Sequence, residues 1–361
     1  MRSGLPGTYP TFIAGERWVV KCFGRPFDGE LAFRTELQTA GLLRLDPQIP
    51  APPLLAAGCL LDAAAGWPWP FLVYPFVPGQ AIGDAWEALD LPERLRLAAE
   101  TGRLLRRLHS LPLDAEPPMA LPACLGRLGA APPLTASWAP HLEFLEEQRQ
   151  TCRERNKGLL PPHLLDQLDV FLPAPADLLD PVIADGAGGA ALGHDDAMPL
   201  QGGPMAQGAG LGPPHLIHAD LTRDHILGRL ELPSGAAASL GHGPTRRGTM
   251  APCPQAAPEP GPPAPRWQTL AWIDFGDARV GGLAYELAAL HLDLFRLDRR
   301  LLHACLDAYG LDPAARQALP RRALAAVLLH QFSRDLLGAV PAALLQAPSL
   351  ETLAQALFGE L

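Results

Sequence analysis

Two apolar runs that each lead to an aspartate constrain the fold of this chain more than any other feature of its sequence. Asp220 lies in the run LIHADLTRDHIL and Asp274 in the run AWIDFGDARVGG. Between them, residues 233–265 are rich in Gly, Ala and Pro and separate the strand-like runs HILGRLEL and WQTLAWIDFG. Without this segment the two strand-like runs would form a tight β-hairpin. The sequence therefore predicts that Asp220 and Asp274 lie close together although they are 54 positions apart.

A second segment, residues 184–212, is similarly rich in Gly and Ala. Neither segment buries enough apolar surface to offset the entropy that ordering costs, so we expect both to be mobile inserts, and their role stays open. The remainder should form a core, because hydrophobic residues make up 48% of the 361-residue chain and charged residues 19%. A chain of this length is typical of two lobes.

Hydrophobic patterns divide the chain into a strand-rich beginning and a helix-rich remainder. Residues 11–23 predict a β-hairpin, residues 28–40 a helix that stops at Gly41, and residues 69–76 a strand. Further helices are expected over residues 90–108, 138–155, 162–172, 283–296, 299–308, 313–338 and 349–358. The predicted fold class is α+β, with a small β-rich part followed by a larger, mostly helical part.

The two aspartates are candidates for phosphoryl transfer, which needs a carboxylate at the attacking hydroxyl and a cation and a metal ion at the phosphates. Asp220 lies in a polar turn with His218, Asp224 and His225. Asp274 ends an apolar strand before Phe-Gly, a position that suits an oxygen ligand of Mg²⁺. Taken singly, each side chain is also explained by turn formation or capping. Two strand-end aspartates on one hairpin favour the functional interpretation.

Three short motifs follow one another in the second half of the chain. They are His218-Ala219-Asp220, Asp274-Phe275-Gly276-Asp277 and Tyr285-Glu286-Leu287-Ala288. Once residues 233–265 are removed, their order and spacing resemble those of the aminoglycoside phosphotransferase and choline kinase-like family, a branch of the protein-kinase-like fold. The resemblance covers residues 7–340 apart from the two inserts. It implies a bilobal fold, with a nucleotide-binding N-lobe of residues 1–76 and a helical C-lobe of residues 77–361 that contains a catalytic β-hairpin and the substrate site.

The same resemblance implies a role for each residue of the hairpin. Asp220 would be the catalytic carboxylate, which orients the acceptor hydroxyl and helps to deprotonate it, and His218 would brace the catalytic loop. Asp274 would chelate Mg²⁺ between the β- and γ-phosphates. The family has a metal-binding Asn where this chain has His225. An imidazole is a poorer partner for Mg²⁺ than an amide oxygen. Because His225 occupies the position of this Asn, we still expect it to contact the metal or a phosphate.

The nucleotide-binding residues are expected in the first 80 positions. Only Lys21 and Lys157 are lysines among the 29 basic residues, which favours a phosphate-binding role for the strand residue Lys21. By resemblance, Lys21 and Glu36 form the pair that holds the α- and β-phosphates, although Glu36 alone is also explained as an exposed helix charge. The C=O of Tyr74 and the N–H of Phe76 would meet adenine, with an ordinary strand before a turn as the alternative.

Composition excludes several other kinds of protein. The formal net charge of −9 and the pI of about 5.6 provide no general basic field, so we expect no nucleic-acid partner. The N-terminus lacks the order of a secretory signal, and no apolar run approaches the roughly 18 residues of a membrane span. We therefore expect a cytoplasmic protein with no membrane association and no obligate protein partner. Its six scattered cysteines are expected to be reduced thiols.

These observations together predict a small-molecule kinase that uses ATP and Mg²⁺. Its acceptor would be a hydroxyl of an aminoglycoside-like, macrolide-like or amino-alcohol compound. Five acidic residues of the helical part are candidate acceptor contacts: Glu143, Glu146, Glu147, Asp293 and Asp298.

Two other functions remain open from the sequence. A nucleotide-binding pseudokinase with a regulatory or docking role is the alternative, because His225 departs from the family motif and the segment before Lys21 has few glycines. A protein kinase is disfavoured, since the run DARVGG after Asp274 leaves too little room for a peptide platform.

Overall fold

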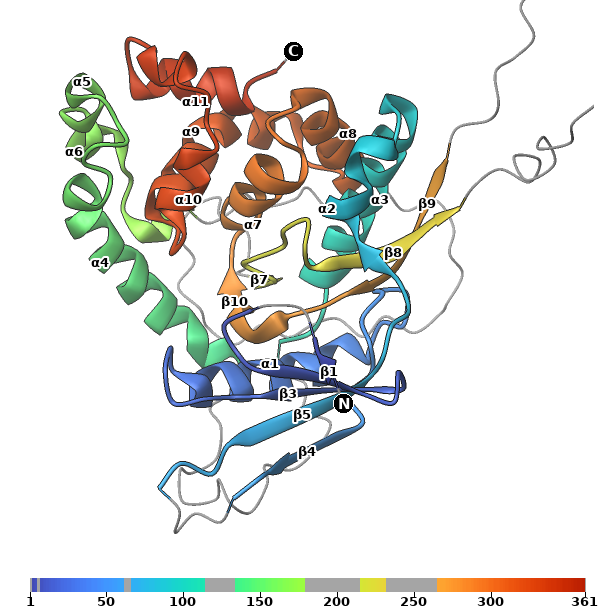
Figure 1. Cartoon of the computed structure of the whole chain (residues 1–361). Coiled ribbons are helices and arrows are strands. Elements are labelled where there is room, and N and C mark those ends of the chain that lie inside the picture. Colours follow the sequence, from blue (N-terminus) through green and yellow to red (C-terminus); the bar gives the residue numbers. More distant parts are fainter. Residues whose placement is uncertain are drawn as a thin grey trace, which may run out of the picture.

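The computed structural model describes residues 2–4, 7–61, 66–113, 134–178, 215–231 and 265–360. Residues 184–212 and 233–264, which are predicted to belong to mobile inserts, lie outside the described residues. In Figure 1 the early strands, with one helix, form a small part below a larger, mostly helical part. The order of elements in the described chain therefore follows the predicted α+β arrangement.

The N-terminal strands form a five-stranded antiparallel sheet in the order β1-β2-β3-β5-β4. They are β1 (Arg2–Ser3), β2 (Thr11–Ala14), β3 (Trp18–Cys22), β4 (Ala56–Cys59) and β5 (Pro70–Pro75). The predicted hairpin over residues 11–23 is confirmed, because β2 pairs with β3. Helix α1 (Gly29–Leu43) continues past its predicted stop at Gly41, since Leu42 is buried in the core and only 1% exposed.

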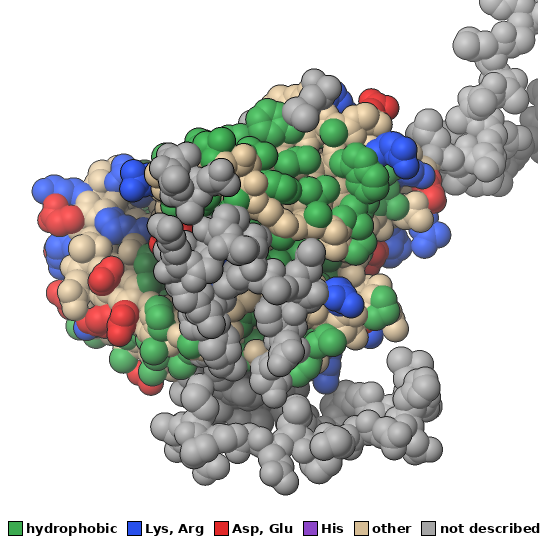
Figure 2. All heavy atoms as spheres, turned by 90° about the horizontal axis from the view of Figure 1, so that it is seen from below, with side chains coloured by type: hydrophobic (Ala, Val, Ile, Leu, Met, Phe, Trp, Pro, Cys, Tyr) green, Lys and Arg blue, Asp and Glu red, His purple; other side chains and the backbone are tan. Residues whose placement is uncertain are grey.

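The two faces of this sheet differ in what covers them. One face carries Lys21 and Leu72, which are opposite each other, and Leu72 packs on α1 through Phe33 and Leu37. On the other face Phe12 and its neighbours form an apolar row across the strands. Figure 2 shows the molecule of Figure 1 from below, and hydrophobic side chains gather on the surface that faces the viewer. The face that carries Lys21 is therefore the one turned towards α1.

The predicted hairpin between the two aspartate-bearing runs is confirmed. Strands β8 (Ile226–Glu231) and β9 (Arg266–Trp272) pair antiparallel, and β6 (Gln80–Ala81) joins them at the edge of β8. A further pair is formed by β7 (His215–Ile217) and β10 (Arg279–Gly281). Asp220 follows β7 and Asp274 follows β9, so these pairings bring the two segments together.

Helices make up most of the remaining described chain. They are α2 (Ile82–Ala85), α3 (Leu91–His109), α4 (Trp138–Arg155), α5 (Pro162–Leu165), α6 (Leu168–Phe171), α7 (Leu283–Ala289), α8 (Arg299–Tyr309), α9 (Pro313–Leu329), α10 (Ser333–Gly338) and α11 (Leu350–Phe358). The single helices predicted over residues 162–172 and 313–338 are each two helices. The second break falls at His330, whose extended backbone, with φ −62° and ψ 147°, ends α9.

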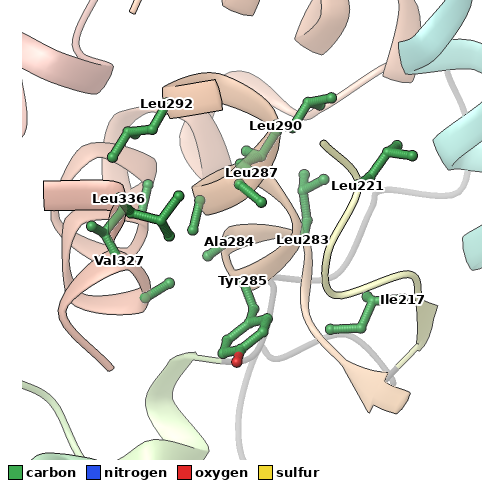
Figure 3. Close-up of a cluster of buried hydrophobic side chains, with 14 of the residues drawn as sticks. Ile217, Leu221, Leu283, Ala284, Tyr285, Leu287, Leu290, Leu292, Val327 and Leu336 are labelled. Carbon is green, nitrogen blue, oxygen red and sulfur yellow. The ribbon is translucent and has the colours of Figure 1, made fainter. Parts of the chain in front are cut away.

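Helix α7 lies inside the helical core, and all seven of its residues are buried. Figure 3 shows Leu287 of α7 in a cluster with Val327 of α9, Leu336 of α10 and Leu221, which follows Asp220. A short π-helix (Leu290–Leu294) continues α7 where one helix over residues 283–296 is predicted. The turn that carries Asp220 is therefore anchored on a densely packed apolar core.

The described cysteines correct one expectation. Cys22, Cys152 and Cys305 are free and buried, but Cys59 is disulfide-bonded, so the prediction of six reduced thiols is wrong for that residue. In the parts of the chain that the structure describes, every helix is too short or too polar to cross a bilayer.

Gly102 allows α3 to approach α8 closely. A Cβ atom at this position would lie 2.0 Å from the backbone oxygen of Cys305. We therefore expect Gly102→Ala to lower the free energy of unfolding by about 1 to 3 kcal/mol through overpacking, measured by urea or thermal unfolding. Gly338→Ala is the control, because a Cβ atom there meets nothing within 4 Å. Equal stability of the two variants would contradict the close approach.

Candidate active site

Lys21 on β3 lies between two carboxylates from distant parts of the chain. Its Nζ is 2.6 Å from Oε2 of Glu36 on α1 and 2.5 Å from Oδ1 of Asp274. The side chains of Lys21 and Glu36 are only 10% and 6% exposed, whereas that of Asp274 is 39% exposed. The expected pairing of Lys21 with Glu36 is therefore present, and Asp274 is a third member of the cluster.

The charges of Lys21 and Asp274 keep each other ionised, whereas burial raises the pKa of Glu36. Burial by itself would lower the pKa of Lys21, but Glu36 and Asp274 outweigh it and raise the pKa above its usual value. Burial would likewise raise the pKa of Asp274, yet Lys21 and then His225 hold it below its usual range. The ammonium and the Asp274 carboxylate are therefore both charged at physiological pH.

The two residues expected at the edge of adenine lie at the end of β5. The hydroxyl of Tyr74 donates to Oε1 of Glu36 at 3.0 Å, so the tyrosine ring supports the lysine-binding carboxylate. The N–H of Phe76 donates to the C=O of Arg17 at 2.9 Å. This backbone bond corrects the expectation that the Phe76 N–H meets adenine, because the donor is already used within the sheet.

The antiparallel ladder indicates which backbone groups near Phe76 point away from β3. Hydrogen-bonded residue pairs alternate with pairs that are not hydrogen-bonded along such a ladder. The pair of Phe76 with Arg17 is hydrogen-bonded, so the next hydrogen-bonded pair is Tyr74 with Val19. Both hydrogen-bonding groups of Tyr74 then face β3. The C=O of Pro75 and the N–H of Val77 face the opposite edge, one residue away from the predicted positions.

His225 lies between Asp220 and Asp274. Its Nδ1 is 2.6 Å from the backbone oxygen of Asp220 and 3.7 Å from the Oδ2 of the same residue. Its Nε2 is 3.8 Å from Oδ2 of Asp274. A carbonyl oxygen only accepts, so Nδ1 carries the proton and Nε2 presents a lone pair on the side of Asp274. One imidazole ring therefore spans the two aspartates, which confirms that the hairpin brings them together.

The environment of Asp220 changes its acidity. Burial raises its pKa to about 7; His225 offsets part of this effect, and the carboxylates of Asp277, Asp274 and Asp293 add to it. A carboxylate with this pKa accepts and releases a proton near neutral pH, as a general base must.

His218 connects the two aspartate-bearing segments. Its Nε2 donates to the C=O of Ile273 at 2.9 Å, and its ring lies 4.5 Å from that of Phe275 between centroids. Burial lowers the pKa of His218 to about 3, so the ring is neutral. The imidazole is in the place from which it would brace the loop, as the resemblance implies.

Ala219 has a left-handed backbone conformation, with a φ of 66°. For a residue other than glycine this conformation costs roughly 1 to 2 kcal/mol. Its N–H donates to Oε2 of Glu286 at 3.0 Å, and its C=O accepts from Nε2 of His330 at 3.1 Å. The peptide groups on both sides of the Ala219 Cα are therefore hydrogen-bonded. No sequence pattern pointed to His330, which is 111 positions away.

A polar network lies beside the catalytic turn. Gln331 donates to Oδ1 of Asp277 and accepts from Arg279, both at 3.0 Å. The Arg279 guanidinium lies over the rings of Phe144 and Tyr285, at 5.6 and 5.7 Å from their centroids. The Asp277 side chain is 43% exposed. The network consists of one carboxylate, one amide and one guanidinium. None of these three residues is among the acceptor contacts predicted from the sequence.

Most of those candidates have other partners. Glu146 pairs with Arg149 on the surface of α4, and Asp298 caps the start of α8. Asp293 accepts from the backbone N–H of Arg223 at 2.8 Å and lies near enough to Asp220 to raise its pKa. The remaining two glutamates are exposed on α4.

Asp274 and His225 are the residues that would hold Mg²⁺. The Asp274 side chain is partly open to solvent, and the Nε2 lone pair of His225 is 3.8 Å from its Oδ2. Neighbouring ligands of an octahedral Mg²⁺ lie about 3 Å apart, so a small shift would let both bind one ion. Within the described ranges no group of three or more His, Cys, Asp or Glu side chains could hold a metal ion. Mg²⁺ is commonly bound by one or two carboxylates with water and phosphates, so Asp274 fits this ion, whereas the imidazole of His225 is a poorer ligand for it.

Tyr9 is a second residue that the sequence did not reveal. It lies between β1 and β2, and its hydroxyl donates to the C=O of Phe27 at 2.7 Å. The Lys21 ammonium is 5.9 Å from its ring centroid. Burial, followed by the charge of Asp277, raises the pKa of Tyr9 to about 12. A tyrosine in a short Gly- and Pro-containing segment carries no pattern that would have identified it.

The comparison with protein families agrees with this geometry. The Phosphotransferase enzyme family matches residues 10–231, which is more than half of the chain. The chain belongs to this family. It is therefore an enzyme, and the expectation of a phosphotransferase is confirmed.

Solved structures extend the comparison to almost the whole chain. The GDP and kanamycin complex of APH(2")-IIIa has a TM-score of 0.53 and 17% identity, and covers 93% of this chain and 89% of its own. The GDP complex of aminoglycoside 2'-phosphotransferase-IIIa has a TM-score of 0.51 and 16% identity, with 93% and 90% covered. ADP-bound APH(2'')-Ib has a TM-score of 0.50 and 15% identity, with 98% and 93% covered. These similarities establish the kinase-like fold that the sequence predicts.

The buried carboxyl of Glu286 should make stability depend on pH. Burial raises its pKa from 4.5 to about 7 in the folded protein. Stability from a raised carboxyl pKa is present below the unfolded pKa and is lost as the pH rises through the folded pKa. Between pH 4.5 and 7 the wild type should therefore lose up to about 3 kcal/mol relative to Glu286→Gln. Urea unfolding of both proteins across this range measures the difference, and parallel profiles would contradict the raised pKa.

Proposed function

We propose that this enzyme transfers the γ-phosphoryl group of ATP, with Mg²⁺, to a hydroxyl of a small molecule. The observation that carries the proposal is the arrangement of Asp220, His225, Asp274 and Lys21. The imidazole separates the two carboxylates, and the ammonium lies on the other side of Asp274 at 2.5 Å. Phosphoryl transfer uses a base, a metal-binding carboxylate and a phosphate-binding cation in this order.

The nucleotide would bind between the small sheet and the hairpin. Lys21, which Glu36 holds in place, would contact the α- and β-phosphates. The edge of β5 would contact adenine through Pro75 and Val77, and Tyr9 would lie over the phosphates. The division of the chain into lobes of residues 1–76 and 77–361 stays a prediction.

Asp274 and His225 would hold Mg²⁺ together with phosphate oxygens. When bound, the ion would neutralise charge on the phosphates. Asp220 would orient the acceptor hydroxyl and accept its proton as the bond from this oxygen to the γ-phosphorus forms and the bond to the leaving ADP breaks. Because the carboxyl of Asp220 has a pKa near 7, it takes this proton without a large energetic penalty at neutral pH.

The acceptor would bind beside Asp277, Gln331 and Arg279. Hydroxylated compounds with an amine fit this combination of exposed carboxylate, amide and aromatic rings, which supports an aminoglycoside-like, macrolide-like or amino-alcohol acceptor. Kanamycin is named with a structurally similar protein, APH(2")-IIIa. A panel of aminoglycosides, macrolides, choline and homoserine, each assayed with ATP and with GTP by release of the nucleoside diphosphate, would identify the substrate pair.

Asp220→Asn tests the catalytic carboxylate. The amide keeps the shape of the side chain but cannot accept the proton, so kcat should fall by about 10³-fold with little change in the affinity for nucleotide. Asp224→Asn is the matched control, because Asp224 is an exposed carboxylate of the same turn. Steady-state phosphorylation of the acceptor found in the panel measures both variants.

Undiminished transfer by Asp220→Asn would refute the assigned role. Magnesium-dependent nucleotide binding by the wild type without transfer to any acceptor would instead support a pseudokinase with a regulatory function. Isothermal titration with ATP and Mg²⁺ separates these results from a failure to bind nucleotide.

Lys21→Arg tests the phosphate-binding cation. Arginine keeps the charge that Glu36 and Asp274 require, but its planar group does not reproduce a compact ammonium. We expect kcat/KM for ATP to fall by about 10- to 100-fold, the value of one hydrogen bond to a charged group. Lys157→Arg is the control, because the Lys157 side chain is 72% exposed. Equal kinetics of the two variants would exclude Lys21 from the phosphate site.

A further inference from the structure

The backbone conformation of Ala219 determines the direction of the Asp220 side chain, because the two residues are adjacent. Ala219 has a φ of 66° and is only 1% exposed. Glycine adopts this conformation freely, whereas alanine does not. The chain therefore needs interactions from outside the loop to keep Ala219 in this state, and the loop motif alone does not supply them.

His330 supplies one of these interactions. It is fully buried, and its Nδ1 accepts the N–H of Phe332 at 3.1 Å. The proton of the neutral ring is therefore on Nε2, which donates to the C=O of Ala219 at 3.1 Å. The ring is also stacked on Tyr285, with centroids 4.4 Å apart. Its position and its tautomer are thus fixed from three sides.

The break between α9 and α10 places this donor. His330 is the residue at which the helical backbone of α9 becomes extended, and the next helix begins at Ser333. In a continuous helix the backbone of His330 would be helical, and its ring would point in another direction. The interruption of a helix predicted over residues 313–338 is therefore what brings the imidazole to the catalytic loop.

We propose that His330 is a positioning residue for phosphoryl transfer, which holds the left-handed Ala219 peptide and thereby directs the Asp220 carboxylate to the acceptor hydroxyl. The proposal rests on the proposed function. Glu286 of α7 accepts from the N–H of Ala219, which belongs to the preceding peptide group, so Glu286 and His330 hold the peptide groups on the two sides of the Ala219 Cα. His330 itself contacts neither the nucleotide site nor the metal-binding pair.

A purely structural role for His330 is the alternative, and His291 provides a matched control. His291 is also fully buried, and its Nε2 is 2.9 Å from the C=O of Leu357, away from the catalytic loop. Substitution of either histidine by leucine removes one buried hydrogen bond to a carbonyl, and His330→Leu also removes the acceptor of the Phe332 N–H. Only His330→Leu should change the geometry of Asp220.

The experiment compares His330→Leu, His330→Gln and His291→Leu in the full-length protein. With His330→Leu, kcat should fall by about 10- to 100-fold while KM for ATP stays within about 2-fold, since a small misplacement of a reacting group has an effect of this size. His330→Gln keeps a donor and should recover most of the rate. His291→Leu should lower the unfolding temperature without a comparable change in kcat.

A double-mutant cycle with Ala219→Gly tests the mechanism itself. Because glycine adopts the left-handed state without help, loss of His330 should reduce kcat less in this background than in the wild type. Equal losses in the two backgrounds, or wild-type kcat in His330→Leu, would overturn the proposal.

Hydrogen exchange gives a readout independent of activity. The amides of residues 219–221 should exchange faster in His330→Leu than in His291→Leu at matched global stability. If His330→Leu does not fold, His330→Asn serves for the same comparison, with His330→Gln as the variant that keeps a donor. Unchanged exchange would also overturn the proposal. If the wild type transfers no phosphoryl group to any acceptor, the proposed function fails, and faster exchange would still show that His330 holds the loop.

Discussion

The buried charge cluster of Lys21, Glu36 and Asp274 is the interaction on which the rest of the site depends. It joins a strand, a helix and the end of the catalytic hairpin through contacts of 2.6 and 2.5 Å. Removing charged groups from water is costly, so a largely buried cluster of this kind is weak support for stability on its own. The cluster instead determines the position of the hairpin. Once the small sheet is packed on α1, the contacts of the cluster determine where the end of the hairpin lies.

The catalytic turn is held by a different kind of interaction. His218 and His330 are neutral buried imidazoles that donate to backbone carbonyls, and Glu286 accepts from a backbone N–H. These bonds fix peptide groups and leave the Asp220 carboxylate itself available for proton transfer. The site therefore combines a rigid backbone with a carboxylate whose acidity is set mainly by burial.

Much of the fold could be predicted because its signals are local. The periodicity of α4 and the Asp90 cap of α3 lie within a few consecutive residues, and both elements appear where expected. The stop predicted at Gly41 is wrong, because burial of Leu42 outweighs local preference, and the continuous helix predicted through His330 is wrong, because the backbone is extended at this residue. The Phe76 N–H, which was expected to meet adenine, bonds within the sheet instead, since strand register depends on pairing partners that the sequence does not specify.

The sequence by itself determined the family motifs, the aspartates, the lone strand lysine and the hairpin that brings Asp220 and Asp274 together, because each is encoded by residue type and short-range pattern. Only the tertiary structure decided that one imidazole would span the two carboxylates, that Asp277 would join Gln331 and Arg279, and that His330 would reach Ala219. These contacts arise where packed elements distant in sequence meet. Their distances follow from the packing of the whole core, which no local pattern encodes.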